Sequence, residues 1–282
     1  MSMIIDFHTH CFPEAIAAKA VGKLAAASRL TPCADGTAGG LSAVAREAGV
    51  DLSIVLPVAT SPGQVSSINR FAASLNERAW KTGLFSFGGA HPEDPDWKAH
   101  LKQVAEMGMK GVKIHPVYQG VDIDDERFVR LLSYAGELGL IVVTHAGDDI
   151  GIPGEVRCSP PMTRRAIRQA GPVTLVLAHM GGWRQWDQVA ECLADTGAYL
   201  DTSFSTGLIP QTDGEPLRAL DEAGFMGLAK AFGPERLLFG TDSPWSDQRE
   251  SIDWIRSLPL SDEEKTAILG GNAMRLLDRD AS

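Results

Sequence analysis

The chain has 282 residues, of which 44% are hydrophobic and 22% are charged, and its formal net charge is −10. This acidity, with no basic run along the chain, argues against nucleic acids and anionic membrane surfaces as partners. The four cysteines lie far apart with no Cys-x-x-Cys pair, and no apolar run reaches about 18 residues, so we expect a cytoplasmic protein with reduced thiols.

The first predicted element is a strand at 3–10, which begins apolar and ends in His8 and His10. Side chains alternate along a strand, so the two imidazoles share a face, roughly 6–7 Å apart. Two neutral imidazoles this close can bind one metal ion. An isolated His-x-His pair also occurs by chance at solvated strand ends. Whether this pair indicates a metal site therefore depends on whether later strands end in similar residues.

Short apolar runs then alternate with helical patterns along the whole chain. Further strands are expected at 51–58, 84–92, 111–116, 140–145, 173–179, 198–203 and 236–242. Helices are expected at 14–28, 41–48, 62–80, 94–107, 124–138, 162–170, 183–194 and 216–232, with more in the tail, one of them capped by Ser261.

Eight strands alternating with helices predict an α/β protein of the (β/α)8 TIM-barrel type. The competing fold is an open doubly wound sheet, which normally carries a glycine-rich phosphate turn after its first strand. That position holds His-Thr-His-Cys-Phe-Pro instead. No composition shift suggests a linker, so we expect residues 1–282 to form one barrel domain with additional C-terminal helices.

Six of the seven histidines fall at or just after the end of a predicted strand, and the eighth strand ends in Asp242. In a barrel these strand ends open on one face, which is the face that hosts active sites. We therefore expect these histidines and Asp242 to lie close together on that face of the barrel. This distribution is far more specific than the opening pair of histidines alone.

With these residues in place, the chain resembles the amidohydrolase superfamily. Within it, the resemblance is to the amidohydrolase-related branch, which contains aminocarboxymuconate semialdehyde decarboxylase, the resorcylate decarboxylases and many hydrolases. The matching segments are Asp6-Phe7-His8-Thr9-His10, Gly111-Val112-Lys113-Ile114-His115-Pro116, Thr144-His145-Ala146-Gly147, Ala178-His179-Met180-Gly181-Gly182, Phe239-Gly240-Thr241-Asp242-Ser243-Pro244 and Leu269-Gly270-Gly271-Asn272-Ala273. They span essentially the whole chain and are specific for the superfamily, but they are poor guides to substrate.

The resemblance implies a metal held by His8, His10, His145 and Asp242, with Asp242 also acting in catalysis. Three imidazoles and one carboxylate suit one divalent ion, best Zn²⁺, with Mn²⁺ or another metal as the alternative. His179 resembles a histidine that binds a second metal in some members and acts on substrate or water in others. We expect it to be catalytic here.

Four further residues are expected on the substrate side of the site. Lys113 is interpreted as a substrate-side or structural lysine, although superfamily members with two metals use a carboxylated lysine on the same strand. Tyr118 and Trp183 lie in loops above the predicted site and would supply flat walls. Arg184 would clamp a substrate carboxylate, or it is an ordinary exposed arginine at a helix start.

These residues predict a metal-dependent hydrolase that uses a metal-activated water on a small carboxylated substrate such as an amide or lactone. The alternative on the same residues is a metal-dependent decarboxylase of a small unsaturated or aromatic acid. A metal-free binding protein is disfavoured by the complete set of histidines with Asp242. The expected partner is a small anionic molecule, with neither nucleic acid nor membrane, and the sequence leaves a homodimer open.

Overall fold

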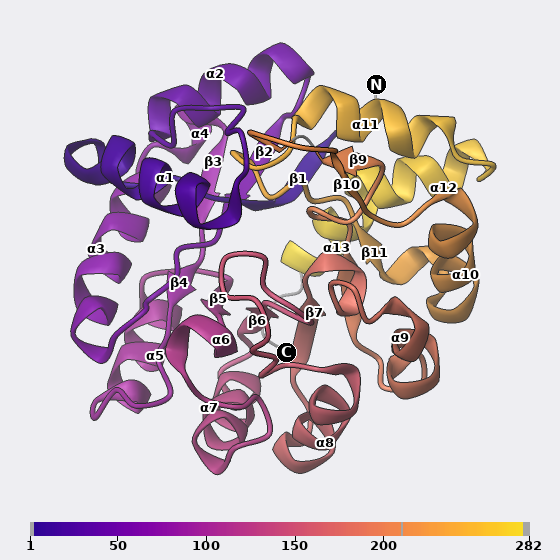
Figure 1. The fold of residues 1–282 in the computed structure, drawn as a ribbon. Coiled ribbons are helices and arrows are strands. Elements are labelled where there is room, and N and C mark those ends of the chain that lie inside the picture. The colour runs from indigo at the N-terminus through magenta and orange to yellow at the C-terminus, as the bar shows by residue number, and fades with distance from the viewer. Residues whose placement is uncertain (1–2, 210, 279–282) are drawn as a thin grey trace.

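The computed structural model describes residues 3–209 and 211–278, which form a ring of parallel strands surrounded by helices (Figure 1). The strands of the ring are β1 (Ile5–Thr9), β2 (Leu52–Val55), β3 (Leu84–Ser86), β4 (Gly88–Gly89), β5 (Gly111–Ile114), β6 (Ile141–Thr144), β7 (Thr174–Leu177), β8 (Tyr199–Asp201) and β11 (Leu237–Leu238). The predicted (β/α)8 barrel is therefore confirmed.

The strands pair in chain order, β1-β2-β3 in one run and β4-β5-β6-β7-β8-β11 in the other. The expected third strand at 84–92 is split at Phe87, and its two parts pair with different neighbours. The first and last strands meet through backbone hydrogen bonds, in which Phe7 N donates to Phe239 O at 2.7 Å and Asp242 N donates to His8 O at 2.7 Å.

Alternation along the strands explains their near-continuous apolar runs, because both faces of a barrel strand are covered. Val143 of β6 packs inside the ring with Phe7 and Ile54, whereas Val142 packs outward with the helices. In β1 the register shifts between Asp6 and Thr9. A shift of this kind re-aims side chains at a strand end.

The helices cover the outside of the ring. The longer ones are α1 (Glu14–Ser28), α2 (Ala38–Ala48), α3 (Val65–Asn76), α5 (Trp97–Glu106), α7 (Glu126–Glu137), α8 (Pro160–Ala170), α9 (Trp186–Leu193), α10 (Glu222–Phe232) and α11 (Gln248–Ser257). Short ones are η1 (Pro62–Gln64), α4 (Ala79–Thr82), α6 (Pro116–Gln119), η2 (His179–Gly181), η3 (Pro234–Arg236), α12 (Asp262–Thr266), η4 (Ala267–Gly271) and α13 (Asn272–Leu277). None of the described helices is both long and apolar enough to cross a membrane.

Several helix boundaries differ from those expected from the sequence; the helix expected at 62–80, for example, is divided into η1, α3 and α4. Two differences have a clear local cause. The helix expected at 216–232 begins only at Glu222, where Asp221 caps it, and the residues before it pair as β9 (Leu208–Ile209) with β10 (Leu217–Arg218). The helix expected at 183–194 begins at Trp186, since Arg184 has a left-handed backbone with φ of 60°. Hydrophobic periodicity does not show such local turns.

Candidate active site

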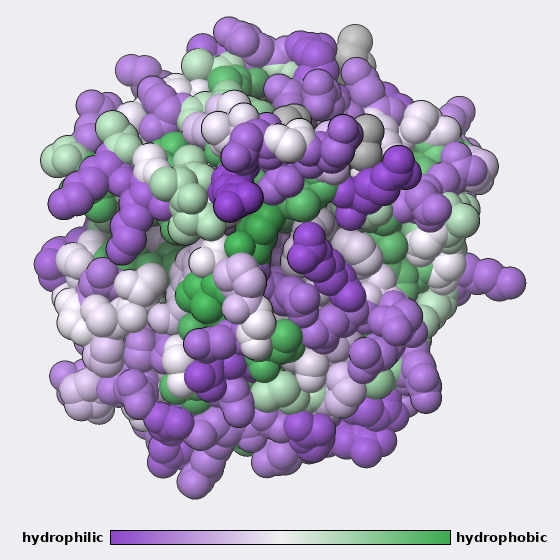
Figure 2. All heavy atoms as spheres, in the orientation of Figure 1, coloured by the Kyte–Doolittle hydropathy of each residue, from purple (hydrophilic) through white to green (hydrophobic). Residues whose placement is uncertain are grey.

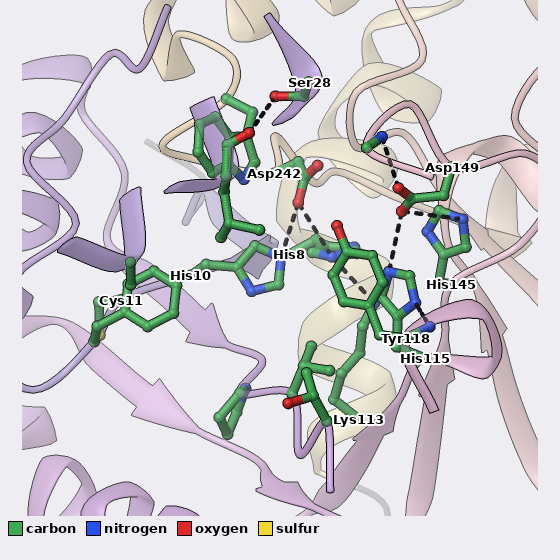
Figure 3. A pocket seen from close by; sticks show the side chains of 18 of the residues that line it. His8, His10, Cys11, Ser28, Lys113, His115, Tyr118, His145, Asp149 and Asp242 are labelled. Carbon is green, nitrogen blue, oxygen red and sulfur yellow. Dashed lines mark hydrogen bonds and ion pairs between the residues drawn. The ribbon is translucent and has the colours of Figure 1, made fainter. Parts of the chain in front are cut away.

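A cavity of about 480 Å³ opens at the C-terminal ends of the barrel strands. Most of the histidines that follow those strands line it, together with Lys113, Tyr118 and Asp242 (Figure 3). The sequence-predicted residues His8, His10, His145, His179 and Trp183 also line the cavity. The barrel thus brings together side chains that lie up to 234 positions apart in the sequence, as from His8 to Asp242.

His8, His10 and Asp242 form a group in which one ligand atom of each lies within 4.8 Å of the others. His8 is the last residue but one of β1, His10 directly follows that strand, and Asp242 lies four residues after the end of β11. The His10 Nε2 atom is 2.8 Å from Asp242 Oδ1, and the His8 Nε2 atom is 3.5 Å from the same oxygen. The closure of the barrel between its first and last strands therefore creates this group.

The hydrogen bonds of the two imidazoles fix which nitrogen is free. His8 Nδ1 lies 2.8 Å from the Asp201 carboxylate, and His10 Nδ1 lies 2.8 Å from Leu56 O. Both partners only accept, so each Nδ1 carries the hydrogen and each neutral ring presents a lone pair on Nε2.

These lone pairs face a carboxylate oxygen, which is also an acceptor. Such an arrangement requires a second proton on a ring or a cation beside the groups. The Lys113 ammonium, 3.2 Å from His8 Nε2, serves the His8 lone pair, which leaves the contact of His10 Nε2 with Asp242 Oδ1 to be explained. For His8 the proton is disfavoured, because burial and then the Lys113 ammonium lower its pKa well below the usual value. The donor set of His8, His10 and Asp242 therefore fits a divalent metal ion.

Asp242 is suited to remain ionised in this setting. Burial alone raises its pKa, but the contact with His10 and the electrostatic effect of the surrounding imidazoles outweigh that effect, so the pKa lies below its usual value. Its backbone is left-handed, with φ of 67°. Aspartate tolerates this conformation better than most residues, and non-glycine residues held there are concentrated at functional sites.

Lys113 of β5 points into the barrel beside the same group. Its Nζ atom lies 3.2 Å from His8 Nε2. Burial lowers the pKa of Lys113 to about 8, against the opposing pull of Asp201 and Asp242. The lysine is thus closer to the candidate metal ligands than to the rim where a substrate would enter.

A second buried group consists of His115, His145 and Asp149. Asp149 Oδ2 lies 3.4 Å from His115 Nε2 and 3.9 Å from His145 Nε2. The His115 Nδ1 atom accepts from Tyr118 N, and His145 Nε2 lies 3.1 Å from the carbonyl oxygen of Asp148, so in both neutral rings Nε2 carries the hydrogen. The rings are also stacked nearly parallel, 4.2 Å apart.

This second group does not suit a metal ion. A ligating nitrogen must offer its lone pair in the plane of its ring, and one ion cannot lie in two parallel planes at once. The arrangement suits a carboxylate that faces two N–H groups. His145, expected beside His8 and His10, falls in this group, and the nitrogen it leaves available for other partners is Nδ1.

His179 connects the two groups. Its Nε2 atom lies 3.0 Å from His145 Nδ1, and its Nδ1 atom lies 3.0 Å from Ser203 O. His179 and Met180 both have left-handed backbones, with φ of 59° and 53°. This turn, η2, places the His179 ring 5.5 Å from the His8 ring, measured between centroids.

The remaining predicted residues separate into two kinds. Tyr118 stacks on His115 at 3.9 Å between ring centroids, and Trp183 is buried against Phe204, so both form walls of the cavity. Arg184 is exposed, lies over the Trp183 ring at 6.0 Å and does not line the cavity. The structure does not bring this arginine to the site.

Gly147 explains how the loops after β6 and β7 lie so close together. Its φ is 86°, and a Cβ atom there would lie 2.1 Å from Trp183 N. The backbone of Gly147 forms a bridge with Trp183. Glycine is needed at this close approach, which fixes both His145 and Trp183 beside the cavity.

Sequence reasoning missed Asp149, Asp201 and Ser203. Asp201 is fully buried, accepts from His8 Nδ1 and receives the backbone N–H groups of His179 and Ser203. The sequence places Asp201 inside the strand expected at 198–203, and this position is the one signal that it offers for the residue. Asp149 lies in an irregular loop, where no periodicity singles it out.

The sequence model of the family described as Amidohydrolase matches residues 5–279. Among curated proteins, none matches the sequence.

Three solved structures illustrate the similarity of fold. An uncharacterised TIM-barrel protein from Bordetella bronchiseptica has a TM-score of 0.73 at 18% identity, covering 98% of each chain. A 5-carboxyvanillate decarboxylase from Novosphingobium aromaticivorans, with manganese and 3-methoxy-4-hydroxy-5-nitrobenzoic acid, has a TM-score of 0.72 at 12% identity, covering 98% of this chain and 97% of that one. A dihydroxybenzoic acid decarboxylase from a Polaromonas species, with manganese and 2-nitroresorcinol, has a TM-score of 0.67 at 16% identity, with the same coverage.

Proposed function

Because the chain belongs to the amidohydrolase family, whose sequence model spans residues 5–279, we propose that it is a metal-dependent decarboxylase of a small aromatic or unsaturated carboxylic acid. The observation that carries this proposal is the pair of imidazole lone pairs that face Asp242 at the base of a deep cavity. The manganese and aromatic ligands of the structurally similar decarboxylases add support.

We assign His8, His10 and Asp242 as ligands of one divalent metal, with His145 as a further ligand through Nδ1. Zinc suits the nitrogen-rich donor set, and manganese is the alternative that the similar structures favour. When bound, the ion supplies positive charge that binds and polarises the oxygens of the substrate. Asp201 holds the His8 tautomer that leaves Nε2 free for this role.

We assign the proton transfers of the decarboxylation to Asp242 and His179. With a hydroxyaryl acid, the Asp242 carboxylate takes the hydroxyl proton and increases the electron density at the ring carbon that bears the carboxylate. His179 takes up a proton from solvent on Nε2, because Nδ1 holds the hydrogen that faces Ser203 O, and it delivers the Nε2 proton to that carbon. The bond to the carboxylate then breaks, its electron pair restores the aromatic ring, and CO₂ leaves. Asp242 returns its proton to the phenolate oxygen, so one proton is consumed for each CO₂ released.

Hydrolysis is the second candidate, as the sequence first predicts. The observation that favours it is the place of the ionised Asp242 carboxylate beside His8 and His10 in the cavity, within reach of a water bound there. Lys113 remains with two proposed roles, as a group beside substrate or, when carboxylated, as a metal ligand. The cytoplasmic location, the single domain and a homodimer also remain proposals.

One isotope experiment separates the two reactions. The metal-loaded protein is incubated in D₂O containing H₂¹⁸O with a panel of hydroxybenzoates and unsaturated lactones, and the products are analysed by mass spectrometry. A decarboxylase releases CO₂ and leaves one deuterium on the carbon that carried it. A hydrolase leaves ¹⁸O in the product and releases no CO₂. The appearance of ¹⁸O without CO₂ would replace the first proposal by the second.

A further inference from the structure

The cavity has two chemically different halves. Its inner half, at the strand ends, holds the histidines, Lys113 and Asp242. Its outer half is lined by α1 and α3: Ile16, Ala20 and Leu24 recur every four residues along α1, and Ile68 and Phe71 belong to α3. This spacing places the three α1 side chains in one stripe on the helix. Figure 2, in the orientation of Figure 1, shows hydrophobic residues near the centre of this face and mostly hydrophilic ones around its edge.

The cavity is larger than one aromatic acid requires. A cavity of about 150 Å³ is enough to hold a benzene ring. The volume here is about 480 Å³. A single-ring acid bound at the metal ligands would therefore leave the outer half, with its apolar walls, in contact with water.

Ile16 supports the presence of an apolar occupant. It is 50% exposed and is the only one of the exposed large hydrophobic residues among those described that lines the cavity. Covering such a side chain gains free energy in proportion to the apolar area removed from water. An occupant in the outer half would cover it.

The charged residues that line the cavity indicate that a molecule bound in the outer half carries no second carboxylate. Among the described residues, no arginine lines the cavity, and Lys113 lies deep beside His8. The acidic residues Asp148 and Asp149 line the cavity on the side of the loop after β6. A second carboxylate far from the metal would have no cation to pair with there.

We propose that the substrate is a monocarboxylic acid whose aromatic or unsaturated head carries an apolar extension of several carbons, bound between α1 and α3. This inference rests on the proposed function for the position of the carboxylate. The apolar extension itself is argued only from the walls of the outer half. The proposed substrates are therefore alkyl-substituted or similarly extended carboxylic acids, and no longer any small acid.

The test is a chain-length series bound to the metal-loaded His179→Ala protein, which should keep the metal without converting the acids, and measured by calorimetry. The variants below carry the same change. The ligands are 2-hydroxybenzoates with hydrogen, methyl, butyl or hexyl at position 4, and the matching 3-alkylphenols, which lack the carboxylate. Affinity should rise about fourfold for each CH₂ that enters the outer half, up to its length. An affinity that stays flat or falls from hydrogen to butyl in both series would overturn the inference.

The two series distinguish this inference from the proposed function. If the carboxylate does not bind at the metal, the acids bind no more tightly than the phenols, but the dependence on chain length remains. If the outer half does not bind an apolar extension, the acids still bind more tightly than the phenols, but affinity no longer depends on chain length.

Matched variants locate the effect. Leu24→Asp should reduce the gain in binding affinity between the unsubstituted and the butyl ligand at least tenfold. Met107 is an exposed apolar residue outside the cavity, so Met107→Asp should leave that gain in affinity unchanged. Ile16→Ser, at a half-exposed position that tolerates a polar side chain, should reduce the gain severalfold. Equal gains in the parent, Leu24→Asp and Ile16→Ser would place the alkyl chain elsewhere and contradict the inference.

Discussion

Asp201 shows how a residue without contact to substrate can control the candidate metal site. Its carboxylate lies 2.8 Å from His8 Nδ1 and is fully buried. Ser203 Oγ donates to the same carboxylate. These contacts hold the His8 ring in one orientation and one tautomer, so the lone pair of Nε2 points toward Asp242 and His10.

We therefore expect Asp201→Asn to weaken divalent-metal binding about 10–100-fold, which is the range for partners of metal-ligating histidines. The affinity is measured by titration against a competing chelator. Asp195→Asn is the control, because Asp195 pairs with Arg164 on the surface, far from the cavity. Unchanged affinity in Asp201→Asn would show that His8 does not depend on this contact for metal binding.

His179 should have a different effect. It lies beside the His8–His10–Asp242 group without belonging to it, so His179→Ala should retain the metal while kcat falls about 10²–10⁴-fold, as expected for a lost proton donor. Metal content and turnover are measured on the same preparation. His100→Ala, on helix α5 and paired with Asp94, should keep both. A His179→Ala protein without metal would make His179 a ligand instead.

At the scale of elements, the strands could be predicted from the sequence and the loops could not. The runs at 111–116 and 140–145 are buried on both faces, and such runs are apolar whatever surrounds them. Phe87 interrupts a predicted strand because the two parts pair with different neighbours, which is a property of the sheet and not of the residue.

The same distinction applies to the site. His8, His10 and Asp242 could be found because each directly follows an apolar run. The pairing of His8 with Asp201 joins residues 193 positions apart, so it exists only once the barrel closes. Asp149 lies in an irregular segment, and its approach to His115 depends on a loop conformation that no pattern encodes.

The cap of α12 gives a prediction for a single element. Ser261 was expected to cap a tail helix, and in the structure it forms a reciprocal capping box with Glu264. Ser261→Ala should lower the free energy of unfolding by about 1 kcal/mol, because a backbone N–H at the helix start loses its acceptor. Urea denaturation measures the change. Ser257→Ala, which removes a hydroxyl bonded within α11, should cost less, and a larger loss there would contradict this account of the cap.

At the scale of the whole molecule, the candidate metal site joins the two ends of the barrel. His8 and His10 belong to the first strand and its exit, and Asp242 follows the last strand. The backbone bonds that close the ring, such as Asp242 N to His8 O, lie next to these side chains. A bound ion would therefore cross-link the first and last strands where the barrel closes.

Removal of the metal should consequently destabilise the fold. A ligand present at about 100 times its Kd stabilises a protein by about 2.7 kcal/mol, which corresponds to roughly 5–10 °C in Tm for a chain of this size. Treatment with a chelator should lower Tm by this amount, and added Zn²⁺ or Mn²⁺ should restore it. An unchanged Tm after complete removal of the metal would mean that the ion does not bridge the closure of the barrel.

The most direct test of the account is the metal content of three proteins, the parent, Asp242→Ala and Asp149→Ala, measured by elemental analysis after loading with zinc or manganese and removal of excess ion. The account predicts about one ion per chain in the parent and in Asp149→Ala, and none in Asp242→Ala, because the His8–His10–Asp242 group offers lone pairs to a cation, whereas Asp149 faces N–H groups of His115 and His145. A parent protein without metal, or an Asp149→Ala protein that loses the ion while Asp242→Ala keeps it, would contradict the account.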